Sequence, residues 1–212
     1  MSIDLFLEIL GFCLGLLYLW WEYHADARLW FVSVVMPGIG MWLYFSKGLY
    51  ADFAINIYYL VIAVYGFIHW TRGDCGGKMV KEKRPVTHAP AWAWLVAMAA
   101  LTLLWILIWW VLVRFTNSTV PVADAFTTAL SIVGMWMMAR KYAEQWWVWM
   151  VVDAVSAGLY LYKGLVFYPV LYAIYTVICI FGYRKWIRIM RSERLTNFRK
   201  SSVNQPPEKG SI

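Results

Sequence analysis

The chain has 212 residues, of which 62% are hydrophobic and 15% are charged, and its mean hydropathy is +0.58. A water-soluble domain of this size cannot bury so much apolar surface, so an ordinary soluble protein is excluded. The net charge of +7 is compatible with nucleic-acid binding, but the basic residues gather in a few short stretches beside apolar segments. Such stretches indicate membrane topology, and we expect no nucleic-acid partner.

Seven segments are apolar and long enough to cross a lipid bilayer. They lie near residues 3–21, 28–46, 50–70, 91–113, 121–140, 145–162 and 166–187. Hydrocarbon offers the backbone no hydrogen-bond partners, and the alternating pattern of a membrane barrel is absent, so each segment must be a helix. The sequence therefore predicts an all-α polytopic membrane protein with seven transmembrane helices.

Two basic stretches predict the orientation of these helices. One is the segment 71–90, and the other begins at Arg184 and continues through the tail 188–212. Because positively charged loops stay in the cytoplasm, both stretches are expected there, with the N-terminus outside. We expect a multi-pass protein of the bacterial inner membrane. Its tail should be disordered from Ser201 onward, since that part can bury nothing.

The chain is similar to itself when it is shifted by about 116 positions, without a gap. Trp30 then aligns with Trp146, and the loop motif Lys-Gly-Leu at 47–49 aligns with the same motif at 163–165. A shared loop motif and several shared tryptophans exceed what two apolar helices match by chance. The comparison predicts two copies of a three-helix unit.

The two copies and their connections define five regions. These are the first repeat (1–70), a basic cytoplasmic loop (71–90), a linker transmembrane helix (91–113), the second repeat (114–187) and the basic tail (188–212). Three helices and one linker make four crossings, so both repeats enter the membrane in the same direction, as a parallel 3+1+3 arrangement. Transporters place a substrate site between two such bundles, although a duplicated structural membrane protein would have the same pattern.

The sixth apolar segment carries the residues that point most directly to a binding site. Trp146, Trp149 and Asp153 recur at helical spacing on one face, with Ser156 and Tyr160 beyond them. A charge inside a bilayer costs at least about 2.5 kcal/mol and usually faces an interior cavity. Two indoles and a carboxylate suit a flat cationic ring. The alternative is that the tryptophans belong to the interfacial aromatic belt and Asp153 pairs with another helix.

The equivalent face of the first repeat has different chemistry. Asp153 aligns with Pro37, and Trp149 aligns with Ser33. Pro37 stands in the sequence Pro-Gly-Ile-Gly, where proline removes a helical hydrogen bond and glycine lets backbones approach. This segment predicts either a hinge or close packing.

The first and fifth segments contain further polar residues. Glu8 lies on a stripe of the first segment that also holds Gly15, Tyr18 and Glu22, and we include Glu8 among the candidate substrate contacts. Glu22 stands near the cytoplasmic boundary and is expected to be interfacial. On the fifth segment, Asp124 begins a polar strip with Thr127, Thr128 and Ser131, which could line a path or bond between helices.

Aromatic and amide side chains on the third and seventh segments complete the candidate site. Tyr172 and Tyr175 share a face of the seventh segment with Tyr168, and Asn56 and Tyr59 share one on the third segment with Asp52. Hydroxyl and amide groups can bond a polar substrate, but tyrosine stripes also occur in ordinary interhelical packing.

The sequence lacks the motifs for metal binding and for several kinds of catalysis. The three cysteines are widely separated, and no second His or Cys stands at ligand spacing from His69 or His88, so we expect no metal. No phosphate-binding loop, nucleophile elbow or H-E-x-x-H motif is present, and we expect neither a catalytic site nor a cofactor. An intramembrane enzyme that uses Asp153, Glu8 and Asp124 as acid and base remains the alternative class.

The segment 141–153 reads Lys-Tyr-Ala-Glu-Gln-Trp-Trp-Val-Trp-Met-Val-Val-Asp. It resembles a motif of the Pnu vitamin transporters, in which Glu precedes W-x-x-W-x-x-x and then Asn or Asp. Further similar stretches are 49–51, Tyr65-Gly66 and Trp70, and the resemblance continues to about Trp186. It implies a fold related to the SWEET sugar carriers, facilitated diffusion with cytoplasmic phosphorylation of the vitamin, and substrate contacts at positions 146, 149 and 153.

The resemblance also implies an order of substrates. Nicotinamide riboside carriers of the family typically have Asn where this chain has Asp153, and an Asn where it has Ala63. These exchanges add a negative charge and favour thiamine, whose thiazolium is permanently cationic. Nicotinamide riboside, itself a cation, is the next candidate and riboflavin the third. The lipid bilayer is the other expected partner, and the sequence allows a homo-oligomer without indicating one.

Overall fold

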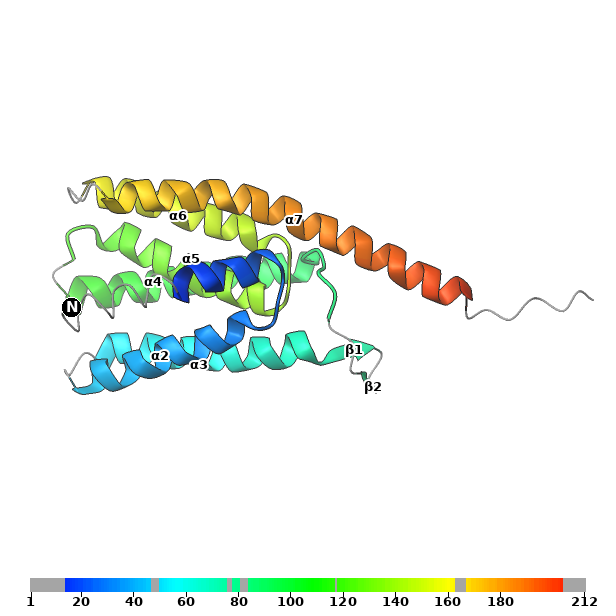
Figure 1. Cartoon of the computed structure of the whole chain (residues 1–212). Coiled ribbons are helices and arrows are strands. Elements are labelled where there is room, and N and C mark those ends of the chain that lie inside the picture. Colours follow the sequence, from blue (N-terminus) through cyan, green and yellow to red (C-terminus); the bar gives the residue numbers. More distant parts are fainter. Residues whose placement is uncertain are drawn as a thin grey trace, which may run out of the picture.

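The computed structural model describes residues 14–46, 50–75, 78–80, 84–116, 118–162 and 167–203, and in this part of the chain it is a bundle of seven helices (Figure 1). The first helix is described over residues 14–23. It is followed by α2 (Leu29–Ser46), α3 (Tyr50–Thr71), α4 (Ala91–Phe115), α5 (Pro121–Ala139), α6 (Gln145–Tyr162) and α7 (Phe167–Val203). Between α3 and α4, β1 (Gly73–Cys75) and β2 (Lys78–Val80) form an antiparallel hairpin.

The predicted all-α fold is confirmed, and α2 to α6 begin and end within two residues of the predicted segments. The last helix differs from the prediction. We expected a tail beyond residue 187 and disorder from Ser201, but α7 continues to Val203 and projects beyond the bundle (Figure 1). The chain from Arg184 to Val203 contains neither glycine nor proline, so nothing in it interrupts the helix where the apolar segment ends.

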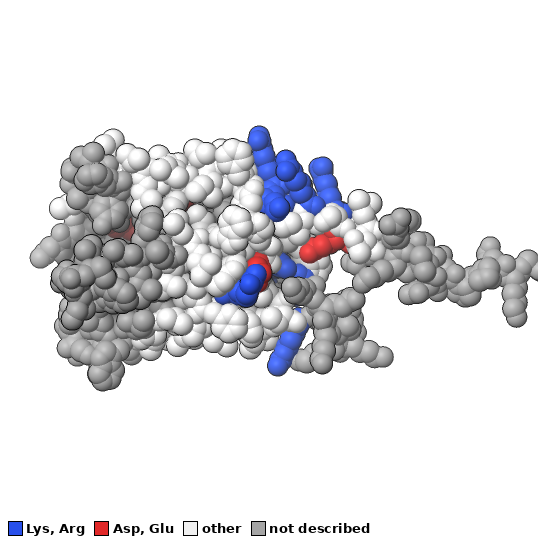
Figure 2. All heavy atoms as spheres, in the orientation of Figure 1, with Lys and Arg blue, Asp and Glu red and all other residues white. Residues whose placement is uncertain are grey.

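Three helical stretches among the described residues are long and apolar enough to span a membrane. They are Ala91–Phe115, Pro121–Ala139 and Pro169–Thr196. The surface of α4 is apolar, with Leu95 73% and Leu103 70% exposed, which suits contact with lipid and not with water. Lys and Arg side chains gather near the end of the bundle from which α7 projects, whereas most of the other described surface is uncharged (Figure 2).

Helices that are neighbours in sequence pack in pairs: α2 with α3, α4 with α5, and α6 with α7. Contacts between early and late helices join these pairs. Tyr58 of α3 donates a hydrogen bond to the carbonyl of Ile132 in α5 (2.7 Å). The Tyr18 hydroxyl of the first helix lies 3.4 Å from the sulfur of Met138 in α5. The segments before and after α4 therefore form one interlocked bundle.

The same helix ending occurs at two positions that are 116 residues apart, which we call equivalent positions. After the first helix, Ala25 has φ 51°, and the N–H of Asp26 donates to the carbonyl of Trp21 (2.9 Å). After α5, Lys141 has φ 63°, and the N–H of Tyr142 donates to the carbonyl of Met137 (3.1 Å). Both are Schellman caps, in which a left-handed residue closes the helix.

A cluster of four tryptophans in the core contains two equivalent pairs. Trp30 packs edge-on against Trp70 with ring centroids 5.5 Å apart, and Trp146 packs edge-on against Trp186 at 5.9 Å. All four are buried. Trp70 and Trp186 also contact each other at 5.9 Å. The internal similarity of the sequence thus extends to the contacts at the centre of the bundle.

Glycines make room for these rings at equivalent positions. A Cβ atom on Gly66 would lie 2.3 Å from Cζ2 of Trp30, and one on Gly182 would lie 2.6 Å from Cε2 of Trp146. Neither distance is compatible with any side chain unless a ring moves. The two glycines therefore let α3 and α7 approach the indoles directly.

The segment 84–90 is held against the ends of α6 and α7. The Nδ1 atom of His88 lies 2.5 Å from Oε1 of Glu144, and the N–H of Ala89 donates to Oε2 of the same carboxylate (2.8 Å). The N–H of Val86 donates to Glu193 of α7 (3.1 Å). The glutamate of the motif in 141–153 therefore anchors the segment that leads into α4.

Candidate functional site

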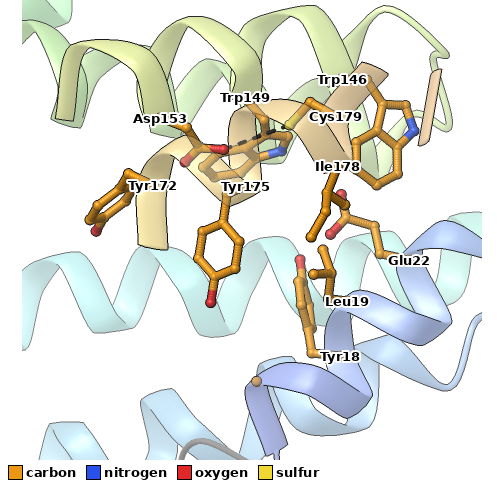
Figure 3. Close-up of a pocket in the computed structure, with 11 residues that line it drawn as sticks. Tyr18, Leu19, Glu22, Trp146, Trp149, Asp153, Tyr172, Tyr175, Ile178 and Cys179 are labelled. Carbon is orange, nitrogen blue, oxygen red and sulfur yellow. Dashed lines mark hydrogen bonds between the residues drawn. The ribbon is translucent and has the colours of Figure 1, made fainter. Parts of the chain in front are cut away.

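A cavity of about 320 Å³ lies between the first helix, α6 and α7, which is within the range of small-molecule sites. Figure 3 shows its lining: Tyr18 and Glu22 enter from the first helix, Trp149 and Asp153 from α6, and two tyrosines from α7. The complete set is Gly15, Tyr18, Leu19, Glu22, Trp146, Trp149, Asp153, Tyr172, Tyr175, Ile178 and Cys179. We call this space the main cavity.

Asp153 is a buried acid in the middle of α6, with 7% of its surface exposed. Its Oδ2 atom accepts a hydrogen bond from the thiol of Cys179 on α7, at 3.6 Å (Figure 3). In the described part of the chain, no Lys or Arg forms an ion pair with it. A thiol is a weak donor, so the carboxylate keeps most of its capacity to bind a positive charge.

The two tryptophans of α6 have different surroundings. Trp146 is 1% exposed and is clamped between Gly182 and Trp186, as Trp30 is in the equivalent place. Trp149 is only partly buried, and it packs over Gly134 of α5, where an added Cβ would lie 3.3 Å from the indole. The indole N–H groups of both tryptophans are buried, and neither has a hydrogen-bond acceptor among the residues that the structure describes. Both rings line the main cavity, but Trp146 is also part of the tryptophan cluster.

The predicted tyrosines of the seventh segment lie in the same cavity. Tyr172 stacks on Tyr160 of α6 with ring centroids 5.3 Å apart and meets Tyr175 edge-on at 6.1 Å. Together with Trp149 they form an aromatic wall around the carboxylate of Asp153 (Figure 3). Five of the eight predicted site residues, Trp146, Trp149, Asp153, Tyr172 and Tyr175, therefore line one cavity.

The other three predicted site residues are not in that lining. Tyr59 borders a second cavity of about 300 Å³, together with Ser33 and Pro37. Asn56 is in the lining of neither cavity. Glu8 lies outside the described residues. Of these two cavities, Tyr59 therefore borders one, whereas Tyr172 and Tyr175 border the other.

The second cavity is the counterpart of the main one. Ser33, Pro37 and Tyr59 in its lining are equivalent to Trp149, Asp153 and Tyr175 in the main cavity. Its remaining lining residues are Gly15, Tyr18, Val32, Met135 and Trp149. Gly15, Tyr18 and Trp149 border both cavities, so the two spaces are neighbours with different chemistry.

Sequence reasoning assigned Glu22 to the membrane interface, whereas the structure buries it. The side chain is 4% exposed and lines the main cavity, and its Oε1 atom accepts a hydrogen bond from Gln145 of α6 (3.1 Å). The sequence already grouped Glu22 with residues of the cavity, because Gly15, Tyr18 and Glu22 share the predicted stripe of the first segment. All three are in the cavity lining.

Three of the four side chains in the polar strip of α5 form hydrogen bonds within their own helix. The hydroxyls of Thr127, Thr128 and Ser131 donate to backbone carbonyls of α5, and Asp124 accepts from Ser118 at 2.7 Å. None of the four is in the lining of the two cavities. Among the described residues, no group of three or more His, Cys, Asp or Glu side chains is placed to hold a metal ion.

An apolar helical bundle with a ligand-sized cavity between its helices suits a membrane protein that binds a small molecule. A family model described as nicotinamide mononucleotide transporter matches residues 5–188. The chain therefore belongs to this family, which confirms the predicted resemblance to the Pnu transporters. The relatives below are transporters, which argues against the intramembrane enzyme that was the alternative class.

Individual relatives have similar lengths and moderate identity. The nicotinamide riboside transporter PnuC of Escherichia coli is 26% identical over 181 residues, which are 76% of this chain and 74% of the relative. The riboflavin/roseoflavin transporter RibM of Streptomyces davaonensis is 27% identical over 191 residues, 88% and 87% of the two chains. A crystal structure of the vitamin B3 transporter PnuC matches with a TM-score of 0.60 at 20% identity, covering 84% of this chain and 79% of that one.

Proposed function

We propose that this protein takes up a flat, cationic vitamin by facilitated diffusion, and that nicotinamide riboside is its substrate. The observation that carries the proposal is the pairing of Trp149 and Asp153 in one cavity. The face of an indole attracts a cation, and a buried carboxylate offsets its charge. The pyridinium of nicotinamide riboside is flat and permanently positive, so it matches both groups.

The relatives support this choice over our first expectation. We expected thiamine before nicotinamide riboside, but the relatives described above are named for nicotinamide riboside, riboflavin and vitamin B3. Thiamine stays the second candidate because Asp153 adds a charge that its thiazolium can use. Riboflavin is the third candidate, because its ring system is uncharged and gains no electrostatic attraction from a carboxylate.

The direction of transport rests on the charge pattern of the chain. We infer that the basic segments lie in the cytoplasm of a bacterium, with the N-terminus outside and the protein in the inner membrane. A carrier without an energy source only equilibrates its substrate, so uptake needs a cytoplasmic kinase that phosphorylates the vitamin and removes it from the equilibrium. The two halves on either side of α4 would rock around the cavity as parallel repeats.

Binding and uptake by the purified protein test the proposal. We expect calorimetry to give a dissociation constant for nicotinamide riboside about tenfold lower than that for riboflavin, a difference of about 1.4 kcal/mol. Liposomes that contain the protein should equilibrate unmodified nicotinamide riboside. Tighter binding of thiamine would replace the substrate by the second candidate. Failure to bind either cation would show that the proposed function is wrong.

A further inference from the structure

Glu22 is a buried acid that the proposed function does not yet use. It lines the main cavity, its carboxylate accepts one hydrogen bond from Gln145, and in the described part of the chain no Lys, Arg or His forms an ion pair with it. A buried carboxylate without a counter-charge is costly, wherever it lies along its helix. Its presence therefore needs a reason.

The partner of Glu22 has unused hydrogen-bonding capacity. Gln145 is 0% exposed, its Nε2 group donates to Glu22, and no donor within the described residues reaches its Oε1 atom. A buried polar atom without a partner costs about 1–3 kcal/mol. Gln145 is not in the cavity lining, so it holds Glu22 from behind, and Glu22 presents its carboxylate to the cavity.

The equivalent positions show that packing does not require this pair. Met138 is equivalent to Glu22 and Leu29 to Gln145, and both are 0% exposed in the core. The surrounding frame is the same, because Trp70 donates its indole N–H to the carbonyl of Met138 (3.1 Å) as Trp186 does to that of Glu22 (2.9 Å). Apolar side chains fill the same frame, so the acid and the amide serve something other than the fold.

We propose that Glu22, held in place by Gln145, forms a second cation subsite in the main cavity, separate from Asp153. Figure 3 shows Asp153 to the left of Trp149 and Glu22 to the right, and all three side chains line the same cavity. Glu22 is near the end of the first helix and Gln145 begins α6, close to the predicted cytoplasmic segment 84–90. A positively charged ring that leaves Asp153 toward the cytoplasm meets Glu22 next. Its hydrogen-bond donors can pair with the carboxylate oxygens of Glu22.

This inference rests on the proposed function, and two variants test it in the full-length protein. Glu22→Gln removes the charge and keeps the shape. The double variant Glu22→Met with Gln145→Leu introduces the residues found at the equivalent positions, so it should pack as Met138 and Leu29 do. Asp124→Asn is the control, because it neutralises another acid outside the cavity lining.

Calorimetry with nicotinamide riboside and with its uncharged dihydro form separates a charge contact from a structural role. Both Glu22 variants should raise the dissociation constant of nicotinamide riboside about tenfold and that of the dihydro form less than about threefold. The control should change neither. Wild-type affinity for nicotinamide riboside in the double variant would overturn the subsite, as would an equal loss of both ligands. A wild-type protein that binds neither ligand would instead overturn the proposed function and the subsite with it.

Discussion

The segments before and after α4 share a frame and differ in the cavities that they line. Trp30 and Trp146 sit over glycines at equivalent positions, and their partners Trp70 and Trp186 make the same hydrogen bonds. The cavity residues are not shared in this way. Where the main cavity has Trp149, Asp153 and Glu22, the equivalent positions hold serine, proline and methionine.

This difference separates the residues that build the protein from those that select its substrate. A residue repeated in both halves, with the same neighbours, is explained by packing alone. A buried polar residue whose counterpart is apolar is not explained in that way, and its cost indicates a function. By this reasoning Trp146 is mainly part of the frame, whereas Asp153 is not, and we propose that Asp153 recognises the substrate together with its neighbour Trp149.

The largest expected effect is on the shared frame. Gly182→Ala would place a methyl group 2.6 Å from Trp146, and Gly66→Ala would place one 2.3 Å from Trp30. Overpacking of this kind costs about 1–3 kcal/mol, and more where a ring cannot move. Both variants should lower the thermal unfolding temperature of the detergent-solubilised protein. Gly158→Ala is the control and should leave it unchanged, because among the described residues its added Cβ would meet no atom within 4 Å apart from the backbone of its own helix and its chain neighbours. A tolerated Gly182→Ala would argue against the common frame.

Asp153→Asn should have the next largest effect, and it acts on only one half. The substitution keeps the shape of the side chain and removes its charge, so a cationic ring loses its counter-charge in a buried place. We expect at least about a tenfold rise in the dissociation constant of nicotinamide riboside, or about 1.4 kcal/mol. Equilibrium binding measures this. Pro37→Ala at the equivalent position carries no charge change and should bind with nearly wild-type affinity. Equal losses in both variants would refute the asymmetry.

An effect of similar size is expected at Trp149. Trp149→Leu keeps an apolar side chain and removes the indole face, so the loss should correspond to a cation–π contact of about 1–2 kcal/mol. The affinity for nicotinamide riboside should fall about five- to thirtyfold, and tryptophan fluorescence quenching by the ligand should weaken. Ser33→Ala is the matched variant, since its hydroxyl bonds to the carbonyl of Leu29 in its own helix (3.1 Å). Undiminished quenching in Trp149→Leu would mean that the pyridinium ring of the ligand does not lie against Trp149.

The smallest effects should again be equal in both halves. Trp70→Phe and Trp186→Phe each remove one hydrogen bond from an indole to a backbone carbonyl of the other half. Each loss should cost about 1 kcal/mol, with some further cost from the smaller ring. Thermal unfolding should therefore shift similarly in the two variants. A shift several times larger in one of them would mean that the two bonds support different structures.

The sequence predicted α2 to α6 closely, but it did not predict where α7 ends. Apolar runs mark where a chain contacts lipid or core, so α2 to α6 were placed within two residues. Hydropathy does not mark where a helix stops, and for this reason the continuation of α7 to Val203 was missed. The helix continues because its basic stretch has good helix-forming residues and no breaker.

The candidate site was predicted only in part, for reasons that follow from the same limits. Asp153 was found because a charge within an apolar segment is conspicuous. Glu22 was assigned to the interface because it lies where an apolar run ends, and only the contact with Gln145 from the other half reveals its burial. Tyr59 has the spacing of Tyr175, but helix spacing does not say which helices meet, and it borders the second cavity.

The structure of the protein with nicotinamide riboside bound tests the central claim most directly, because the two cavities are neighbours and differ in charge. We expect the pyridinium ring to lie in the main cavity, against the indole of Trp149 and within ion-pair distance of the Asp153 carboxylate. A ring in the second cavity, beside Ser33 and Pro37, would contradict it.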